Sequence, residues 1–142
     1  MNEIIMAKKS DDSITLEKLE EKYNVLIPTG DKFVMKSISR GVPKKKQLNY
    51  ADRDLIVARF LSVSLKDKVN IWTMGNLINE ESDAVCIPVA EDGFGGLYCM
   101  VFYSKDEYKM EYFPHEHDDD QRLVLCSTYK EFLGMLDLNF YD

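Results

Sequence analysis

The clearest pattern along the chain is a pair of apolar runs on either side of a glycine-rich turn. Residues 85–90 and 97–103 are rich in aliphatic and aromatic side chains, which is typical of buried strands. Between them lies Glu91-Asp92-Gly93-Phe94-Gly95-Gly96, where aspartate favours a turn and glycine accepts a positive φ. Pro88 donates no ladder hydrogen bond, so the first strand is expected at a sheet edge or at a bulge. The pattern predicts a hairpin around which the rest of the chain is arranged.

Apolar positions spaced three and four apart predict helices at both ends of the chain. The first helix is expected over roughly 16–23, with Ser13 or Thr15 as its cap. The second is expected from about 30 to 39, capped by Thr29 and followed by Gly41 just past its end. A last helix is expected over 128–137, with Ser127 as its cap and four side chains turned inward: Tyr129, Phe132, Leu133 and Leu136.

The middle of the chain predicts further strands. These are expected at 48–50, 56–64 and 123–126, and at 108–113, which alternates and pairs with 97–103. Residues 69–72 are either a strand end or the lead into a short helix at 74–78, and Trp72 is expected in the core or its rim. The order predicts an α+β fold, a single domain in which N-terminal helices and a C-terminal helix pack on an antiparallel or mixed sheet. Residues 1–12 are expected to be a flexible lead-in to this domain at 13–142.

Charge narrows the class of partner. The 142 residues carry a formal net charge of −7, whereas a nucleic-acid binder is expected to present a basic face. An acidic chain is compatible with solubility alone, and equally with docking on a basic protein. No apolar run reaches the roughly 18 residues of a membrane span, and no signal peptide is evident, so we expect a cytoplasmic protein. The three cysteines, at 86, 99 and 126, are predicted to be reduced thiols.

One loop carries residue types that ligate metals or transfer protons. His115-Glu116-His117-Asp118-Asp119-Asp120 has side chains suited to zinc or manganese, although a single loop without a second cluster is more typical of a hydrated turn. Glu91 or Asp92 beside His115 resembles an acid–base pair, but the spacing in sequence does not fix their separation. The glycines at 93, 95 and 96 lack the ending of a phosphate loop. We therefore predict no catalytic residue, no cofactor and no metal, with a metal-dependent hydrolase as the least favoured alternative.

Several motifs occur in a particular order along the chain. They are the first helix, Ile27-Pro28, Ser39-Arg40-Gly41-Val42-Pro43, Phe60-Leu61-Ser62, the corner at 87–96, Tyr112-Phe113-Pro114-His115-Glu116, and the closing helix at 127–136. This ordered set resembles the SUKH superfamily, specifically its fungal cell-wall-assembly-regulator branch, the Smi/Knr type. The chain departs from the family pattern at four places: Asp31 replaces a tyrosine, Ser39-Arg40-Gly41 an Asn-Gly-Gly, Gly96 an asparagine and Phe113 a tryptophan.

The resemblance implies a protein-binding role. Bacterial members look like immunity proteins that bind and neutralise a cognate toxin, often a nuclease, and an acidic protein complements a basic nucleic-acid cleft. We therefore predict a partner-binding face made of Glu91, Asp92, Phe94, His115, Glu116, Asp118, Asp119 and Asp120. Taken singly, each acid is better explained as a solvated loop residue. The expected partner is a toxin domain of basic character, and the expected state is a monomer or weak dimer. The alternative is a regulatory scaffold in cell-wall or envelope synthesis.

Overall fold

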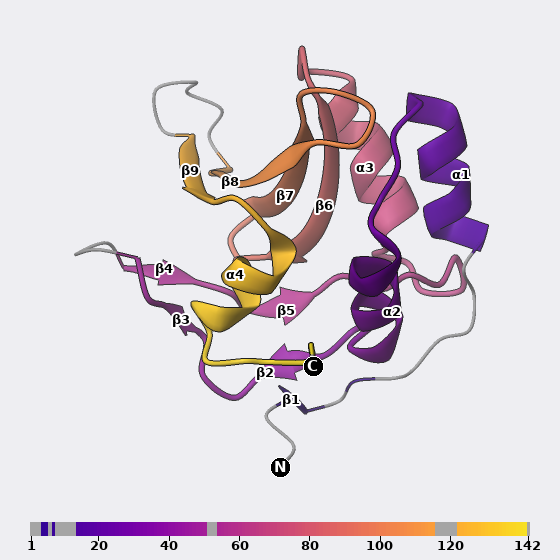
Figure 1. Ribbon diagram of the computed structural model, residues 1–142. Helices are drawn as coiled ribbons and strands as arrows, with labels where there is room; N and C mark the ends of the chain where they lie inside the picture. The colour runs from indigo at the N-terminus through magenta and orange to yellow at the C-terminus, as the bar shows by residue number, and fades with distance from the viewer. Residues whose placement is uncertain (1–3, 6, 8–13, 51–53, 116–121, 142) are drawn as a thin grey trace.

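A five-stranded antiparallel sheet organises the protein. The computed structural model describes residues 4–5, 7, 14–50, 54–115 and 122–141 (Figure 1). In chain order the elements are β1 (Ile4–Ile5), α1 (Ile14–Tyr23), α2 (Thr29–Ser37), β2 (Val42–Pro43), β3 (Gln47–Leu48), β4 (Leu55–Ile56), β5 (Arg59–Phe60), α3 (Ile71–Asn79), β6 (Val85–Glu91), β7 (Leu97–Phe102), β8 (Tyr108–Phe113), β9 (Leu123–Cys126) and α4 (Tyr129–Gly134). The main sheet has the order β5-β6-β7-β8-β9, and β1 pairs with β2 and β3 with β4. The predicted α+β fold is confirmed.

The predicted hairpin of β6 and β7 lies inside this sheet. Every side chain of β7 is buried, and β7 is the central strand between β6 and β8. The register between β6 and β7 shifts between Pro88 and Ala90, so the bulge alternative is correct. Pro88, which has no N–H to donate, therefore lies where the hydrogen-bond ladder between β6 and β7 is already irregular.

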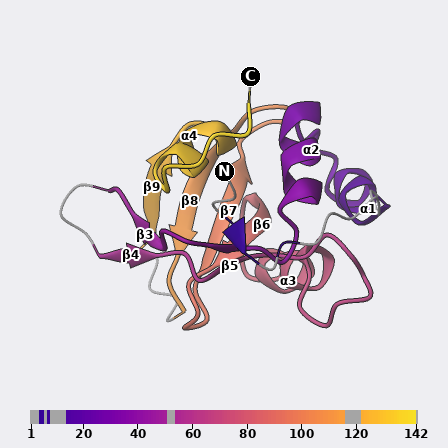
Figure 2. The same ribbon diagram turned by 90° about the horizontal axis from the view of Figure 1, so that it is seen from below.

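Helices cover the main sheet on both faces (Figure 2). On one face, the ring of Tyr98 packs against Phe132 of α4 at 5.5 Å, and Tyr108 donates to Asp31 of α2. On the other face lies α3, whose Gly75 is close to the Pro88 ring of β6, and whose Asn79 side chain bonds the N–H and the C=O of Cys86 along the edge of β6. Burial on both faces explains why β7 is apolar throughout rather than alternating.

Gly75 allows α3 to lie close to its neighbours. A Cβ added at this position would lie 3.3 Å from Cδ2 of Leu19 in α1 and 3.5 Å from Cδ of Pro88 in β6. The small residue therefore lets α3 pack between α1 and the sheet.

Helix boundaries differ from those predicted because hydrogen bonds decide them. In α4 the cap is Thr128, whose Oγ1 accepts from the N–H of Glu131 at 3.1 Å, so the prediction of Ser127 is wrong. In α2, Thr29 is the first helical residue rather than the cap. Thr15 lies within α1 rather than capping it, while Ser13 is outside the described residues.

The end of α2 also differs from the prediction. The helix ends at Ser37 with Ile38 as its C-cap, and Arg40, not Gly41, has the left-handed backbone with φ of 67°. Gly41 instead allows close packing, because a Cβ there would overlap the side chain of Ile4. The buried stripe of α2 at Val34, Met35 and Ile38 is confirmed.

The single strand predicted over 56–64 is wrong. The N–H of Val57 donates to Lys46 O, whereas that of Ala58 donates to Glu91 O. These two bonds transfer the chain from the β3–β4 pair to the main sheet, so β4 and β5 are separate short strands. Of the strand predicted at 48–50, only Leu48 lies in a strand, as the second residue of β3.

Residues 69–72 lead into a helix. Asn70 caps α3 by accepting from the N–H of Thr73 at 2.9 Å. Trp72 therefore lies on the first turn of α3 rather than near a strand end. It is partly buried, and Lys22 Nζ lies 5.2 Å from its ring centroid.

Candidate functional site

The end of β6 and the loop that joins it to β7, residues 91–96, form a hydrogen-bonded corner. The Oδ1 atom of Asp92 accepts from the N–H groups of Phe94, at 2.7 Å, and Gly96, at 2.8 Å. The N–H of Asp92 also donates to Gly96 O at 3.1 Å. Gly93 and Gly95 have φ values of 85° and 94°, which side chains with a Cβ rarely adopt. The glycines noted in the sequence are thus needed for the turn itself.

Asp92 is buried and holds the corner to the sheet. Its Oδ2 atom accepts from the hydroxyl of Tyr112 in β8 at 2.6 Å. Both carboxylate oxygens therefore accept hydrogen bonds from within the protein. This geometry gives Asp92 a structural role, positioning the residues beside it.

The corner and His115 lie against each other. A Cβ added at Gly95 would overlap the imidazole of His115, so the ring packs directly on the glycine. His115 is exposed, and Phe94 is 76% exposed beside the same glycine. The structure thus places His115 against the corner that carries the exposed Phe94 and the buried Asp92.

A shallow apolar groove adjoins this corner. It has a volume of about 190 Å³ and is lined by Met74, Leu77, Ile78, Glu80, Glu81, Gly95, Leu97 and Phe113. We call it the α3 groove, because five of these residues lie on or just after α3. Leu77 is 54% exposed, and the two glutamates add negative charge at the helix end. The α3 groove shares Gly95 with the corner, so the exposed Phe94 stands beside it.

The predicted acids are distributed unevenly. Glu91 is partly exposed at the end of β6, where it pairs with Arg59 of β5. Glu116, Asp118, Asp119 and Asp120 lie outside the described residues. Their contribution to the partner-binding face stays a prediction.

No group of three or more His, Cys, Asp or Glu side chains within the described residues is arranged to hold a metal ion. His117 and residues 118–120, on which the metal interpretation relied, lie outside that part of the chain. Of the acid–base pair considered from the sequence, Asp92 is committed to hydrogen bonds in the corner. The helices that the structure describes include none long and apolar enough to cross a membrane.

The cysteines and several tyrosines are held in their neutral forms. Burial raises the pKa of Cys86 and Cys99, and burial with the nearby charge of Glu131 raises the pKa of Cys126 to about 12. Burial also raises the pKa of Tyr98, assisted by the neighbouring Tyr112 and Asp92. Because the thiolate is the reactive form, these thiols are poor nucleophiles at neutral pH.

Two surface features escaped prediction from the sequence. The α3 groove combines α3 with strand ends more than fifteen residues away in sequence, which no local pattern indicates. A second pocket is lined by Arg40, Arg59 and Lys68, from three separate segments. Its one signal in the sequence is Arg40, which stands where the family motif has a glycine.

Comparison with known proteins agrees with the resemblance seen in the sequence. Residues 14–133 match the model of the SUKH_6 family, described as SMI1-KNR4 cell-wall. No curated protein and no solved structure matches the chain. The matched residues run from the first residue of α1 to within α4 and include the whole main sheet. The chain therefore belongs to the SUKH superfamily, through its SMI1-KNR4 family.

Proposed function

We propose that this protein is a non-enzymatic binding module, an immunity protein that neutralises a cognate toxin by covering its active cleft. The observation that carries the proposal is the side chain of Phe94, which is 76% exposed on a corner fixed by hydrogen bonds. Leaving so large an apolar side chain in water has no evident benefit to the fold. A partner that covers Phe94 would provide one.

The corner has the properties of an interface anchor. Aromatic side chains are enriched among the residues that dominate binding energy, particularly where they are held rigidly beside a pocket. The two bonds to Asp92 Oδ1 restrict the backbone of Phe94, so less freedom is lost on binding. The adjoining α3 groove offers apolar walls to a side chain of the partner.

The charges favour a basic partner. Glu80 and Glu81 line the α3 groove, and Glu91 lies at the other end of the corner loop. With a formal net charge of −7, the protein would be steered towards a positively charged surface. The nucleic-acid cleft of a nuclease toxin is such a surface. Glu116 and Asp118, Asp119 and Asp120 are further acids that we propose at this interface.

The first experiment uses the full chain as bait in lysate of its native cells, at low and moderate salt. The expected result is one basic toxin domain, identified by mass spectrometry and retained less at the higher salt. Purified toxin domain should then lose its activity on addition of the protein. Recovery of a toxin that remains fully active in the complex would contradict the proposal.

Two matched variants test the surface itself. Phe94→Ala should weaken binding of the toxin domain by about 2 kcal/mol or more, roughly thirtyfold, if it is an anchor. Phe33→Ala removes an equally large side chain, 63% exposed on α2, and should leave the affinity within about twofold. Replacing Asp118, Asp119 and Asp120 by Asn should weaken binding mainly at low salt. Equal losses of affinity in Phe94→Ala and Phe33→Ala would show that Phe94 does not anchor the interface.

The description of the matching family favours a second candidate, a regulatory scaffold in cell-wall synthesis. This function would use the same corner to bind an envelope-synthesis or signalling protein. The experiment above distinguishes the two, because such a protein would be recovered in place of a toxin. In that case, Phe94→Ala should abolish recovery of the envelope-synthesis or signalling protein. No toxin would be recovered, so there would be no toxin activity for the protein to inhibit.

A further inference from the structure

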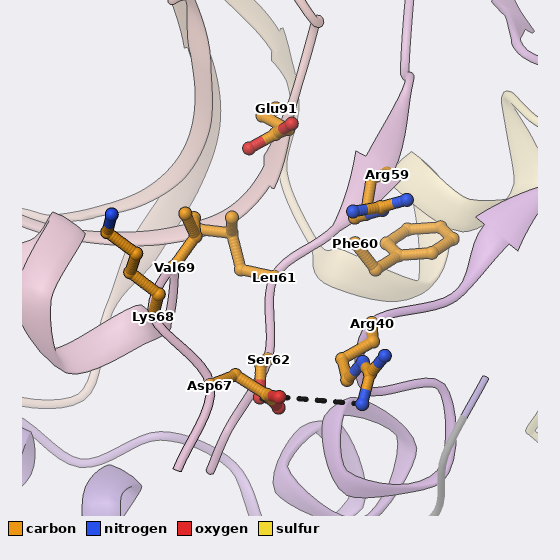
Figure 3. A pocket seen from close by; sticks show the side chains of 9 residues that line it. All are labelled: Arg40, Arg59, Phe60, Leu61, Ser62, Asp67, Lys68, Val69 and Glu91. Carbon is orange, nitrogen blue, oxygen red and sulfur yellow. Dashed lines mark hydrogen bonds and ion pairs between the residues drawn. The ribbon is translucent and has the colours of Figure 1, made fainter. Parts of the chain in front are cut away.

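A second pocket lies beside Glu91, the first residue of the corner. It has a volume of about 230 Å³ and is enclosed by the turn after α2, by β5 with the residues that follow it, and by the loop before α3 (Figure 3). The lining residues are Arg40, Arg59, Phe60, Leu61, Ser62, Asp67, Lys68, Val69 and Glu91. Figure 3 shows Arg40 and Arg59 on one side of the opening and Lys68 and Val69 on the other.

The pocket is more positive than the protein around it. Three cationic side chains line it, Arg40, Arg59 and Lys68, against the two carboxylates of Asp67 and Glu91. The chain as a whole has a formal net charge of −7, so this local excess of positive charge runs against the general composition. All three cationic residues are exposed, and their charged groups are therefore accessible to a ligand.

Arg40 adopts a backbone conformation that is unfavourable for its residue type. Its φ of 67° is left-handed, where glycine is favoured and a side chain with a Cβ is disfavoured. In return, the guanidinium lies at the pocket, where Nη1 is 3.4 Å from Oδ1 of Asp67. Unfavourable backbone geometry of this kind is concentrated at functional sites.

Asp67 lies across from Arg40 at the pocket and pairs with its guanidinium (Figure 3). Its Oδ2 accepts a 2.5 Å hydrogen bond from Ser62 Oγ, which fixes the carboxylate. A guanidinium has five N–H donors, and the pair with Asp67 engages one of its terminal nitrogens. Arg40 thus retains donors for a ligand while its position is restrained.

Backbone hydrogen bonds join the three segments of the pocket. Phe60 N donates to Gly41 O, Leu61 N to Val89 O, and Ile71 N to Ser62 O, at 2.8, 2.9 and 2.8 Å. These bonds connect the Arg40 turn, β5 and the loop that carries Asp67 and Lys68. The cationic groups are therefore presented on a preorganised frame, which reduces the cost of binding.

We propose that this pocket binds a small molecule that carries a carboxylate or phosphate group. Arginine matches both groups because its planar fork donates two parallel hydrogen bonds to an oxyanion. Sites for drug-sized ligands have volumes of about 300–1,000 Å³, so this smaller pocket suits a compact acid rather than a nucleotide. The pocket shares Glu91 with the partner-binding corner, but its three cationic residues lie outside that corner, and the proposal does not depend on the proposed immunity function.

The proposal is tested by titrating the full chain with inorganic phosphate and, separately, with malonate, followed by nuclear magnetic resonance. Saturable shifts of the amide signals of residues 59–62 and 67–69 are expected with at least one probe, and the two probes distinguish a tetrahedral from a planar oxyanion. Raising the chloride concentration should weaken this binding. Absence of saturable shifts with both probes, or binding of acidic peptides alone, would overturn the proposal.

Variants distinguish binding in the pocket from general electrostatic attraction of anions to the protein. Arg59→Gln and Arg40→Gly should each lower the affinity about tenfold or more, because each removes a charge-assisted hydrogen bond. Lys66→Ala also removes one positive charge. Lys66 is exposed in the loop that carries Asp67 and Lys68 but does not line the pocket, so this variant should change the affinity less than about twofold. Arg40→Gly suits its backbone conformation, so loss of the fold would not explain its result. Equal effects of Arg59→Gln and Lys66→Ala would reject the site.

Discussion

The hydroxyl of Tyr112 donates a 2.6 Å hydrogen bond to Oδ2 of Asp92. This bond joins β8 to the corner, because Oδ1 of the same carboxylate accepts from the N–H groups of Phe94 and Gly96. Tyr112 in turn packs on Tyr98, with ring centroids 4.8 Å apart. The position of the exposed Phe94 is therefore set by a tyrosine near the end of another strand.

Tyr112→Phe should destabilise the protein and loosen the corner. The change leaves Asp92 Oδ2, which is buried, without this donor, so we expect the free energy of unfolding to fall by about 1–2 kcal/mol. Urea denaturation measures the difference. Tyr50→Phe is the control, because the Tyr50 hydroxyl makes a more exposed, 3.2 Å bond to Val124 O and its loss should cost less than about 0.5 kcal/mol. Equal losses for the two variants would contradict the role given to Asp92.

Alkaline pH should destabilise the protein from about pH 10. Burial, followed by the hydrogen bond to Asp31, raises the pKa of both Tyr108 and Tyr141 above their ordinary value of 10.0. As pH rises past that value, tyrosines ionise first in the unfolded chain, so the unfolded state is favoured and stability falls. The midpoint of urea denaturation, determined at several pH values between pH 8 and pH 11, measures this fall in stability.

Tyr141→Phe tests the cause of that alkaline loss. Without the Tyr141 hydroxyl, which donates to Asp31 Oδ1 at 2.5 Å, the variant should be less stable at pH 8 but lose less stability towards pH 11. A fall in stability of the same size in both proteins would show that this hydroxyl contributes nothing to the pH dependence.

Arg40→Gly should stabilise the fold. Glycine removes the cost of a left-handed Cβ residue, about 1–2 kcal/mol, and the lost Arg40–Asp67 pair is exposed enough to be worth less. The greater freedom of glycine in the unfolded chain offsets part of the gain, which leaves about 0.5–1 kcal/mol. Lys36→Gly is the control, because glycine within α2 should lower stability by up to about 1 kcal/mol. A loss of stability in Arg40→Gly would show that the arginine stabilises its own turn.

The thiols should react slowly in the native protein. Cys86 and Cys99 are buried and Cys126 is partly buried, and each pKa is raised, to about 12 for Cys126. At pH 8, iodoacetamide should label Cys126 first and the other two only after unfolding, since the thiolate is the attacking form. Mass spectrometry of the labelled protein measures the order. Prompt labelling of Cys99 would mean that the β7 core opens readily.

Local patterns in the sequence were sufficient for the strands that carry the fold. The bounds of β8 and β9 agree with prediction, and β7 ends one residue earlier than expected. The continuous apolar run of β7 reflects burial on both faces of the sheet. The alternation of β8 predicted a strand correctly, although Glu111 and Phe113 on its second face are buried as well. The glycine-rich corner was also predicted from the sequence, because glycine adopts positive φ values readily and Gly93 and Gly95 have them.

Tertiary contacts decided the rest. The run 56–64 has uniform strand propensity, but hydrogen bonds from Val57 and Ala58 to different partners divide it between two sheets. Of the predicted face, His115 packs on Gly95, the residue after Phe94. Asp92 supports the corner instead of facing a partner, because its buried carboxylate accepts hydrogen bonds from backbone N–H groups. The α3 groove and the arginine pocket were beyond sequence reasoning, because each assembles side chains from segments that only folding brings together.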